Sequence, residues 1–251
     1  METGQTQHSL ASEPELVQAL RSVTQLLEAD VGYFMLRAHA EDKIVHHVLL
    51  ACDARFGWEY AAKDFSSSDP WFRYATGHSA PVLAADLFCD SRRERAVVEL
   101  AAKYGFAEAA LFPAPSPQGR LRIGLLAVGT REPGMRERFA KAGYRAAARD
   151  IAMGLHEQWV DMQREAFVRS SEMSLLDLRI LELELRGWGT KAIARHLRTT
   201  DASVNSRVQR LTNKLLMPNR RAAALRSLEL GLICLTDCQD TPIRRRTPQP
   251  A

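Results

Sequence analysis

The apolar residues near the start of the chain recur at the spacing of an amphipathic helix. Its apolar face holds Leu16, Leu20, Val23 and Leu27. Ser12 and Glu15 form a capping box at the start of this pattern, because each side chain can accept a hydrogen bond from the backbone at the other's position. The pattern therefore predicts a first helix that begins just after Ser12.

Three later segments, residues 31–38, 44–52 and 121–129, are short, apolar and rich in β-branched or aromatic residues, which is typical of strands. The apolar segment 109–115 is followed by a tight turn at "QG", just before the last of them. Helical patterns at 58–65 and 91–104 lie between them. A longer helical pattern extends from Met135 to about Gln163 and would cover one face of the sheet or a second subunit. This order predicts a mixed α/β domain over residues 1–163.

Helical periodicity is lost at residues 164–173, where Ser and charged residues gather, so we predict a linker there. Residues 174–234 then carry four helical patterns, each with its own start and stop signals. Their predicted N-caps are Ser174, Thr190, Asp201 and Asn219. The composition of residues 235–251 is typical of a flexible tail. The expected fold class is α+β, an α/β domain followed by four helices.

The third of these helical patterns has an apolar stripe and a polar face opposite it. At 100° per residue the stripe consists of Val204, Val208, Leu211 and Leu215. The opposite face holds Asn205, Ser206, Gln209 and Asn213, and Arg207, Arg210 and Lys214 flank it. Amides can read base edges while cationic side chains hold phosphates, so we interpret this segment as a DNA-recognition helix. The short helix before it, marginal on its own, would brace it.

The distribution of charge supports this interpretation. Residues 172–251 hold 14 of the 34 Lys and Arg residues but 8 of the 30 Asp and Glu residues. A basic excess confined to one end of a chain favours a polyanion such as double-stranded DNA. A solvated basic face would have the same composition, so charge alone leaves both interpretations open.

The C-terminal segment resembles the LuxR-type helix-turn-helix domain over its full length, through "MSLLDLRILELELRGWGTKAIARHL", "ASVNSRVQRLTNKL" and "NRRAAALRSLELGLI". We expect a homodimer on an inverted repeat, with the long helix 135–163 and Ala224, Leu225 and Leu228 as dimer surfaces. Asn205, Ser206, Gln209 and Asn213 should meet bases. Thr190, Lys191, Ser203, Arg207, Arg210 and Lys214 should hold phosphates. Two positions depart from the family: Arg198 replaces a turn glycine, and Asn205 replaces Lys or Arg.

Residues 10–163 resemble the autoinducer-binding domain of quorum-sensing LuxR regulators, which is an α/β/α sandwich. The segments "FGWEYAAKDFSSSDPW" and "KYGFAEAALFPAP" carry the similarity. The family binds N-acyl homoserine lactones, and the aspartate of an Asp-Pro pair holds the ligand amide. The matching pair here is Asp69 and Pro70, and Tyr60 occupies the place of an aromatic wall.

Other pocket positions lack the expected donors or aromatic surfaces. Phe56 replaces a tryptophan, Cys52 a tyrosine, Ala84 a second tryptophan, Ala109 a glycine and Leu125 a hydroxyl residue. Because each buried carbonyl left without a donor costs about 1–3 kcal/mol, we expect no standard lactone to bind. Three interpretations stay open: a different, more apolar ligand, no ligand, or a lactone held by shifted residues such as Trp58 or Trp71. Asp69 could equally be a helix cap before a proline.

Enzymatic and metal-binding patterns do not stand out in this sequence. His46 and His47 are neighbours on a predicted strand and point to opposite faces. Cys234 and Cys238 lack the second pair of a zinc site, and with Cys52 and Cys89 they are too few for a disulfide framework. We therefore expect a non-enzyme without a cofactor.

The first residues, "METGQTQHSLASEPE", lack the basic-then-apolar layout of a signal peptide, and no apolar run approaches about 20 residues, so we expect a cytoplasmic protein with no membrane partner. Two other functional classes stay open. One is an enzyme with an appended basic tail. The other is a ligand-independent regulator or anti-activator that heterodimerises with a related LuxR-type protein.

Overall fold

One sheet organises the first part of the chain. The computed structural model describes residues 7–10, 14–40, 43–116, 122–170 and 172–233, and the chain divides into two units, residues 1–167 and 168–251. The strands are β1 (Gln7–Leu10), β2 (Val31–Ala40), β3 (Lys43–Ala51), β4 (Val82–Leu83), β5 (Glu108–Pro115) and β6 (Arg122–Thr130). They pair in the order β1-β3-β2-β6-β5-β4. β1 and β3 are parallel, and the other neighbouring pairs are antiparallel.

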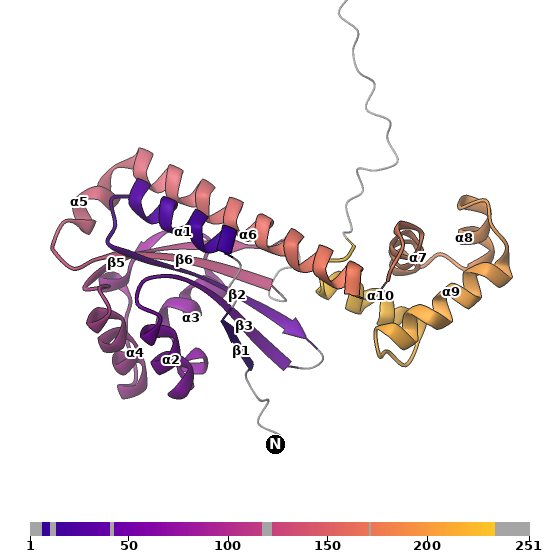
Figure 1. Cartoon of the computed structure of the whole chain (residues 1–251), viewed down its shortest axis with the longest axis horizontal. Coiled ribbons are helices and arrows are strands. Elements are labelled where there is room, and N and C mark those ends of the chain that lie inside the picture. Colours follow the sequence, from indigo (N-terminus) through magenta and orange to yellow (C-terminus); the bar gives the residue numbers. More distant parts are fainter. Residues whose placement is uncertain (1–6, 11–13, 41–42, 117–121, 171, 234–251) are drawn as a thin grey trace, which may run out of the picture. The chain divides into compact units, whose positions relative to one another are not determined.

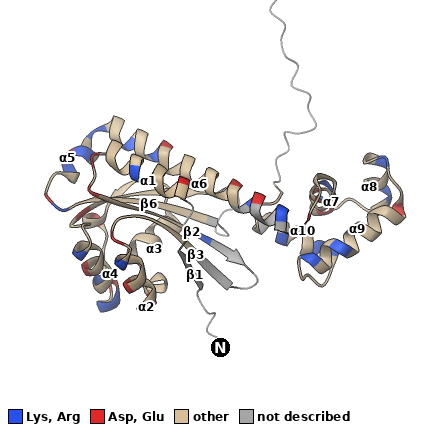
Figure 2. Cartoon of the chain, in the orientation of Figure 1, with Lys and Arg blue, Asp and Glu red and all other residues tan. Residues whose placement is uncertain are grey.

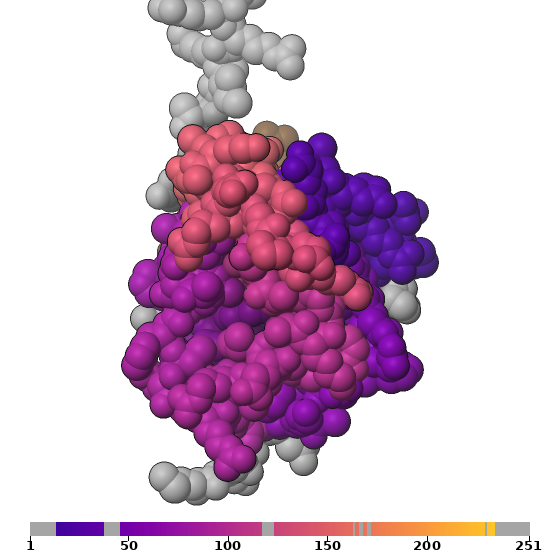
Figure 3. All heavy atoms as spheres, turned by 90° about the vertical axis from the view of Figure 1, so that its left-hand side faces the viewer, coloured from indigo at the N-terminus to yellow at the C-terminus, as the bar shows by residue number. Residues whose placement is uncertain are grey.

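Helices cover both faces of this sheet (Figure 1), so the predicted mixed α/β domain is confirmed. The helices of the first unit are α1 (Pro14–Leu26), α2 (Arg55–Ala62), α3 (Pro70–Gly77), α4 (Arg92–Lys103), α5 (Met135–Ala140) and α6 (Ala142–Ser170), with 3-10 turns at Phe65–Ser68 and Ala84–Asp86. α1 and α6 lie side by side over one face (Figure 3).

Each sheet face packs its own hydrophobic core, because successive strand residues point to opposite sides. Phe34 and Leu36 belong to the core that includes residues of α1 and α6. Tyr33 and Met35 belong to the core that includes residues of α2, α3 and α4. The second core lies where the autoinducer-binding resemblance places a ligand.

The structure corrects the helical prediction for residues 135–163. This segment forms two helices, because Lys141 has an extended backbone with φ −71° and ψ 121°. The second of them, α6, continues to Ser170, so most of the segment predicted as the linker 164–173 is helical. Neither β1 nor α3 was predicted. The predicted cap Ser12, Cys234, Cys238 and the tail 235–251 lie outside the described residues.

The second unit consists of four described helices. They are α7 (Leu175–Leu185), α8 (Thr190–His196), α9 (Asp201–Lys214) and α10 (Arg220–Glu229). Ile180, Leu183, Ile193, Ala194 and Val204 form a core shared by the first three. In the described parts of the chain, no helix has the length and hydropathy needed to cross a membrane.

Two of the four predicted N-caps in this unit are confirmed and two are wrong. Ser174 caps α7 in a capping box with Asp177, and Asn219 caps α10. Thr200, not Asp201, caps α9, because its hydroxyl accepts a hydrogen bond from the backbone N–H of Ser203 at 3.2 Å.

The N-cap of α8 is Gly189, not Thr190. The Thr190 hydroxyl is engaged with other side chains: it accepts a hydrogen bond from Arg220 and pairs with Asn205.

Candidate functional site

Asp69 is buried at the start of α3, where it caps the helix. Its Oδ1 accepts hydrogen bonds from the backbone N–H groups of Trp71, at 2.8 Å, and Phe72, at 3.1 Å. Its Oδ2 accepts one from the hydroxyl of Tyr60 at 2.7 Å. Burial raises the pKa of Asp69, although these hydrogen bonds oppose the shift. The structure thus joins the predicted Asp69–Pro70 pair to Tyr60 and uses the carboxylate as a helix cap.

Aromatic rings fill the space beside Asp69 between the sheet and the helices. Tyr33 stacks on Phe56 with ring centroids 5.8 Å apart and on Trp71 at 6.3 Å. Phe106 meets Tyr33 edge-on at 5.5 Å and Trp71 at 6.0 Å. We call these four residues the ring cluster. All four side chains of the ring cluster are buried.

The other predicted pocket residues surround the ring cluster at different depths. Leu125 and Ala109 are buried in the same core, whereas Cys52 and Ala84 are partly buried against it. Burial raises the pKa of the Cys52 thiol to about 12, so the thiol is neutral. Trp58 is 61% exposed and lies outside this core.

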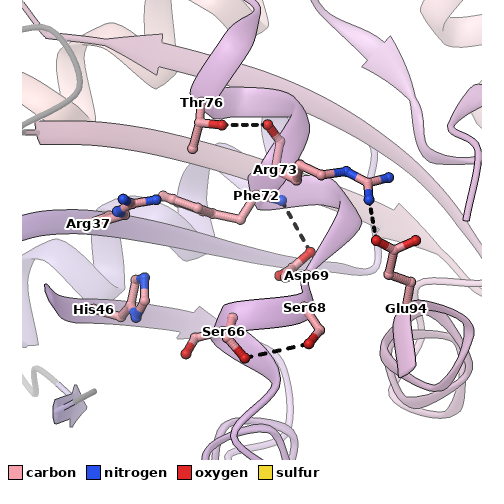
Figure 4. A pocket seen from close by; sticks show the side chains of 10 residues that line it. Arg37, His46, Ser66, Ser68, Asp69, Phe72, Arg73, Thr76 and Glu94 are labelled. Carbon is pink, nitrogen blue, oxygen red and sulfur yellow. Dashed lines mark hydrogen bonds and ion pairs between the residues drawn. The ribbon is translucent and has the colours of Figure 1, made fainter. Parts of the chain in front are cut away.

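Two cavities lie next to these residues. The smaller, of about 210 Å³, is lined by Trp71, Ala84 and Ala109 together with Leu83, Ala85, Val98, Phe106, Ala107, Glu108, Met135 and Arg136. The larger has a volume of about 310 Å³, and Asp69 is the predicted site residue in its lining. We call this larger cavity the polar pocket. Its other lining residues are Arg37, His46, Ser66, Ser67, Ser68, Phe72, Arg73, Thr76 and Glu94 (Figure 4).

The polar pocket draws its side chains from five elements. Arg37 on β2 and His46 on β3 are register partners, so they stand beside each other on the same sheet face as Tyr33. The His46 ring meets Phe72 of α3 edge-on at 5.7 Å. Serines of the 3-10 turn and Glu94 of α4 close the other sides (Figure 4). His47 points to the opposite face, where its ring meets Trp159 of α6, as the strand pattern predicts.

The carboxylates of the polar pocket are engaged by other groups. Glu94 forms an ion pair with Arg73 and accepts a hydrogen bond from the backbone N–H of Asp90 at 2.6 Å. In contrast, the Nε of Arg37 and the Oγ of Ser66 are buried without a hydrogen-bond partner among the described residues. Burial also lowers the pKa of Arg37.

In the second unit, the polar face of α9 is open to solvent. Asn205, Ser206, Gln209 and Asn213 are all exposed, while Val204 and Leu211 of the apolar stripe are buried. Figure 2 shows Lys and Arg on α8 and along α9. Lys191 is exposed, and Thr190 and Ser203 are partly buried.

The three cationic residues predicted to flank this face have partners inside the unit. Arg207 and Arg210 both pair with the buried carboxylate of Asp177, at 2.9 and 2.8 Å. Burial raises the pKa of Asp177, but the hydrogen bonds from Ser174 and Arg207 and the charge of Arg210 outweigh it and hold that pKa below its usual value. Lys214 donates to the backbone carbonyl of Glu172 at 3.3 Å.

A chain of polar contacts connects the other helices to α9. Arg220 of α10 forms an ion pair with Glu184 of α7 and donates a hydrogen bond to the Thr190 hydroxyl at 3.1 Å. That hydroxyl then donates to Oδ1 of Asn205 at 3.2 Å. We call this series the Arg220 relay.

The turn between α8 and α9 contains a backbone conformation that favours glycine. Arg198 has φ +51°. The backbone N–H of Thr199 bonds to the carbonyl of Ala194 at 2.9 Å, and that of Arg198 to the carbonyl of Arg195 at 3.3 Å, which is a Schellman motif. Arg198 therefore occupies the left-handed position where the resembled family has its turn glycine.

Comparisons with known proteins agree with this architecture. The model of the autoinducer binding domain family matches residues 12–158. A structure of SdiA in complex with octanoyl-rac-glycerol is similar over 89% of this chain and 90% of that chain, with a TM-score of 0.60 and 15% identity. A crystal structure of Escherichia coli SdiA is similar over 90% and 93%, with a TM-score of 0.59 and 17% identity. No curated protein sequence matches significantly.

Proposed function

The chain belongs to the autoinducer-binding family of LuxR-type regulators, and from this premise we propose that it is a dimeric, sequence-specific DNA-binding transcriptional regulator. Proteins of this family typically regulate transcription by binding DNA. In this proposal α8 and α9 form the helix-turn-helix, and α9 enters the major groove. The first unit receives a small molecule other than a standard acyl homoserine lactone.

The observation that carries the proposal is the division of α9 into two faces. Val204 and Leu211 anchor the helix, while Asn205 and Gln209, one turn apart, present amides to solvent. An amide side chain can pair with adenine in the major groove, so the half-site should carry an A·T pair at the Gln209 step. The second unit has little other reason to keep a row of exposed amides on its longest helix.

The ligand part of the proposal rests on the ring cluster. Tyr33, Phe56, Trp71 and Phe106 pack against one another beside Asp69, so a lactone would have to displace packed rings. The similar SdiA structure contains octanoyl-rac-glycerol, which is consistent with a fold that accepts ligands other than lactones.

Selection of bound sequences from a random DNA pool, with the full-length protein, tests the DNA-binding part. We expect an inverted repeat, and Gln209→Ala should relax the consensus at one step and cost about 1–3 kcal/mol on the selected site. Lys191→Ala removes an exposed cation near α9 and should weaken binding to all sequences while lowering the salt slope by about 1.

Gln25→Ala on α1 is the matched control, because it removes an equally exposed amide far from α9 in sequence and should change nothing. An unchanged consensus with Gln209→Ala would refute the orientation of α9. A protein that sediments as a monomer with and without DNA would refute the dimer.

A further inference from the structure

We propose that the polar pocket binds the anionic end of a small molecule, a carboxylate or a phosphate, and that Arg37 is its counter-ion. The inference deepens the proposed role of the first unit as a ligand receptor, and it rests on that role. This ligand differs from the more apolar one that the sequence favours, because Arg37 and His46 of this pocket are not among the pocket positions that the family resemblance supplies.

The first observation is the position of Arg37. Its position on β2 places it beside His46, on the sheet face that carries Tyr33. Its Nε is buried without a hydrogen-bond partner among the described residues. Desolvation of this guanidinium lowers its pKa. A desolvated cation destabilises a protein unless an anion pairs with it, so such a residue in a cavity favours a ligand-binding role.

The second observation is that the carboxylates of the polar pocket are already used. Glu94 pairs with Arg73 and also receives hydrogen bonds from the backbone of Asp90 and Ser91. Asp69 receives its hydrogen bonds from Tyr60 and from the start of α3. Neither carboxylate therefore serves as a counter-ion for Arg37 among the described residues.

The third observation is a second open donor. The hydroxyl of Ser66 is buried and has no hydrogen-bond partner among the described residues, whereas its neighbour Ser67 donates to the carbonyl of Asp64 and Thr76 donates to the carbonyl of Arg73. A carboxylate or phosphate can accept from a guanidinium and from a hydroxyl at once, since each has several acceptor oxygens.

The size and walls of the polar pocket restrict the rest of the ligand. Its volume of about 310 Å³ is at the small end for ligand pockets, so the ligand is a small acid and not a long-chain lipid. The rings of Phe72 and His46 line the pocket and meet edge-on, and the body of an aromatic or short aliphatic acid would pack against them.

The test compares simple probes on the full-length protein at constant ionic strength. Benzoate and phenyl phosphate carry the proposed anionic groups, and benzamide is the neutral isostere of benzoate. We expect benzoate, phenyl phosphate or both to raise the melting temperature in proportion to concentration, while benzamide has no effect. The benzoate and phenyl phosphate results distinguish a carboxylate from a phosphate ligand. A rise with benzamide as large as that with benzoate, or no rise with either benzoate or phenyl phosphate, would overturn the proposal.

Variants then assign the effect to the polar pocket. Arg37→Met should raise the melting temperature of the unliganded protein, because it removes a partly desolvated charge that has no counter-ion among the described residues. It should also weaken binding of the active probe about tenfold to a hundredfold. Ser66→Ala should weaken binding less. Arg21→Met, on the exposed side of α1, is the matched control and should change neither quantity.

A structural role for Arg37 gives the opposite result. In that case Arg37→Met lowers the melting temperature and leaves the probe affinity unchanged, which would overturn the proposal. None of these measurements involves DNA, so failure of this inference and failure of the proposed DNA binding are observed separately.

Discussion

Replacing Arg198 by glycine should stabilise the second unit. Arg198 has φ +51°, where a side chain with a Cβ costs about 1–2 kcal/mol. Glycine removes this cost but adds about 0.4–1 kcal/mol of freedom to the unfolded chain. The expected net gain for Arg198→Gly is therefore about 0.5–1 kcal/mol. Arg198 is exposed, so few side-chain contacts are lost with it.

Hydrogen exchange of peptides from α8 and α9 in the full-length protein measures this gain locally. An increase of about 0.5–1 kcal/mol slows exchange about two- to fivefold. Arg198→Ala is the matched control, because it removes the same charge and side chain but keeps the Cβ, and it should not slow exchange. Faster exchange in Arg198→Gly than in Arg198→Ala would refute the assignment of backbone strain to this turn.

Three further predictions concern buried groups. Asp177→Asn should lower the free energy of unfolding in urea by about 2–3 kcal/mol, because Arg207 loses its anionic partner. The pKa of Asp177 is lowered in the folded state, so the parent protein loses this stabilisation as the pH falls below about 3.9. The variant should not show that loss. Tyr60→Phe should cost about 1–3 kcal/mol at neutral pH by removing a hydrogen bond to buried Asp69. The loss should shrink toward pH 4, because the pKa of Asp69 is already raised and the carboxyl becomes protonated there; a loss independent of pH would contradict this account. Acyl homoserine lactones of any chain length should leave the melting temperature unchanged, because Trp71 is packed in the ring cluster. A shift of several degrees that Asp69→Ala abolishes would contradict this prediction.

Sequence periodicity predicted most of the first unit because its strands are strongly apolar. β2, β3 and β6 carry β-branched or aromatic residues, β5 is an apolar segment before a tight turn, and all four are present. β1 was missed because "QHSL" contains too few apolar residues to show a strand pattern. α3 was not predicted because it is short. Asp69 and Pro70 at its start match the family's ligand motif and are also typical of a helix start.

The break between α5 and α6 has no signal in the hydrophobic pattern. The apolar positions continue at helical spacing on both sides of Lys141, so periodicity alone joins the two helices. The extension of α6 past residue 163 was not predicted because the apolar pattern stops there although the helix continues. Its last turns are polar and charged, and such residues form a helix as readily as they form a linker.

The candidate pocket was predicted only in part. Asp69 and Tyr60 were named from their resemblance to a family motif, and the structure brings them into contact. Arg37 and His46 were not named as pocket residues, because a polar residue near a strand end usually faces solvent. Only the register of β2 and β3 shows that the two residues share the inner face.

The Arg220 relay has a consequence for how this protein would choose its DNA sequence. Because the Thr190 hydroxyl donates to Oδ1 of Asn205, that oxygen is already engaged, and Asn205 would meet a base mainly through its NH2 group, as a donor. Acceptors in the major groove, such as guanine O6 and N7 or thymine O4, would then suit this position as well as adenine does. Selectivity at one base step would thus be shared with Arg220, a residue on another helix that need not touch the DNA. A regulator built this way can change its target promoters through α10 while the sequence of α9 stays the same.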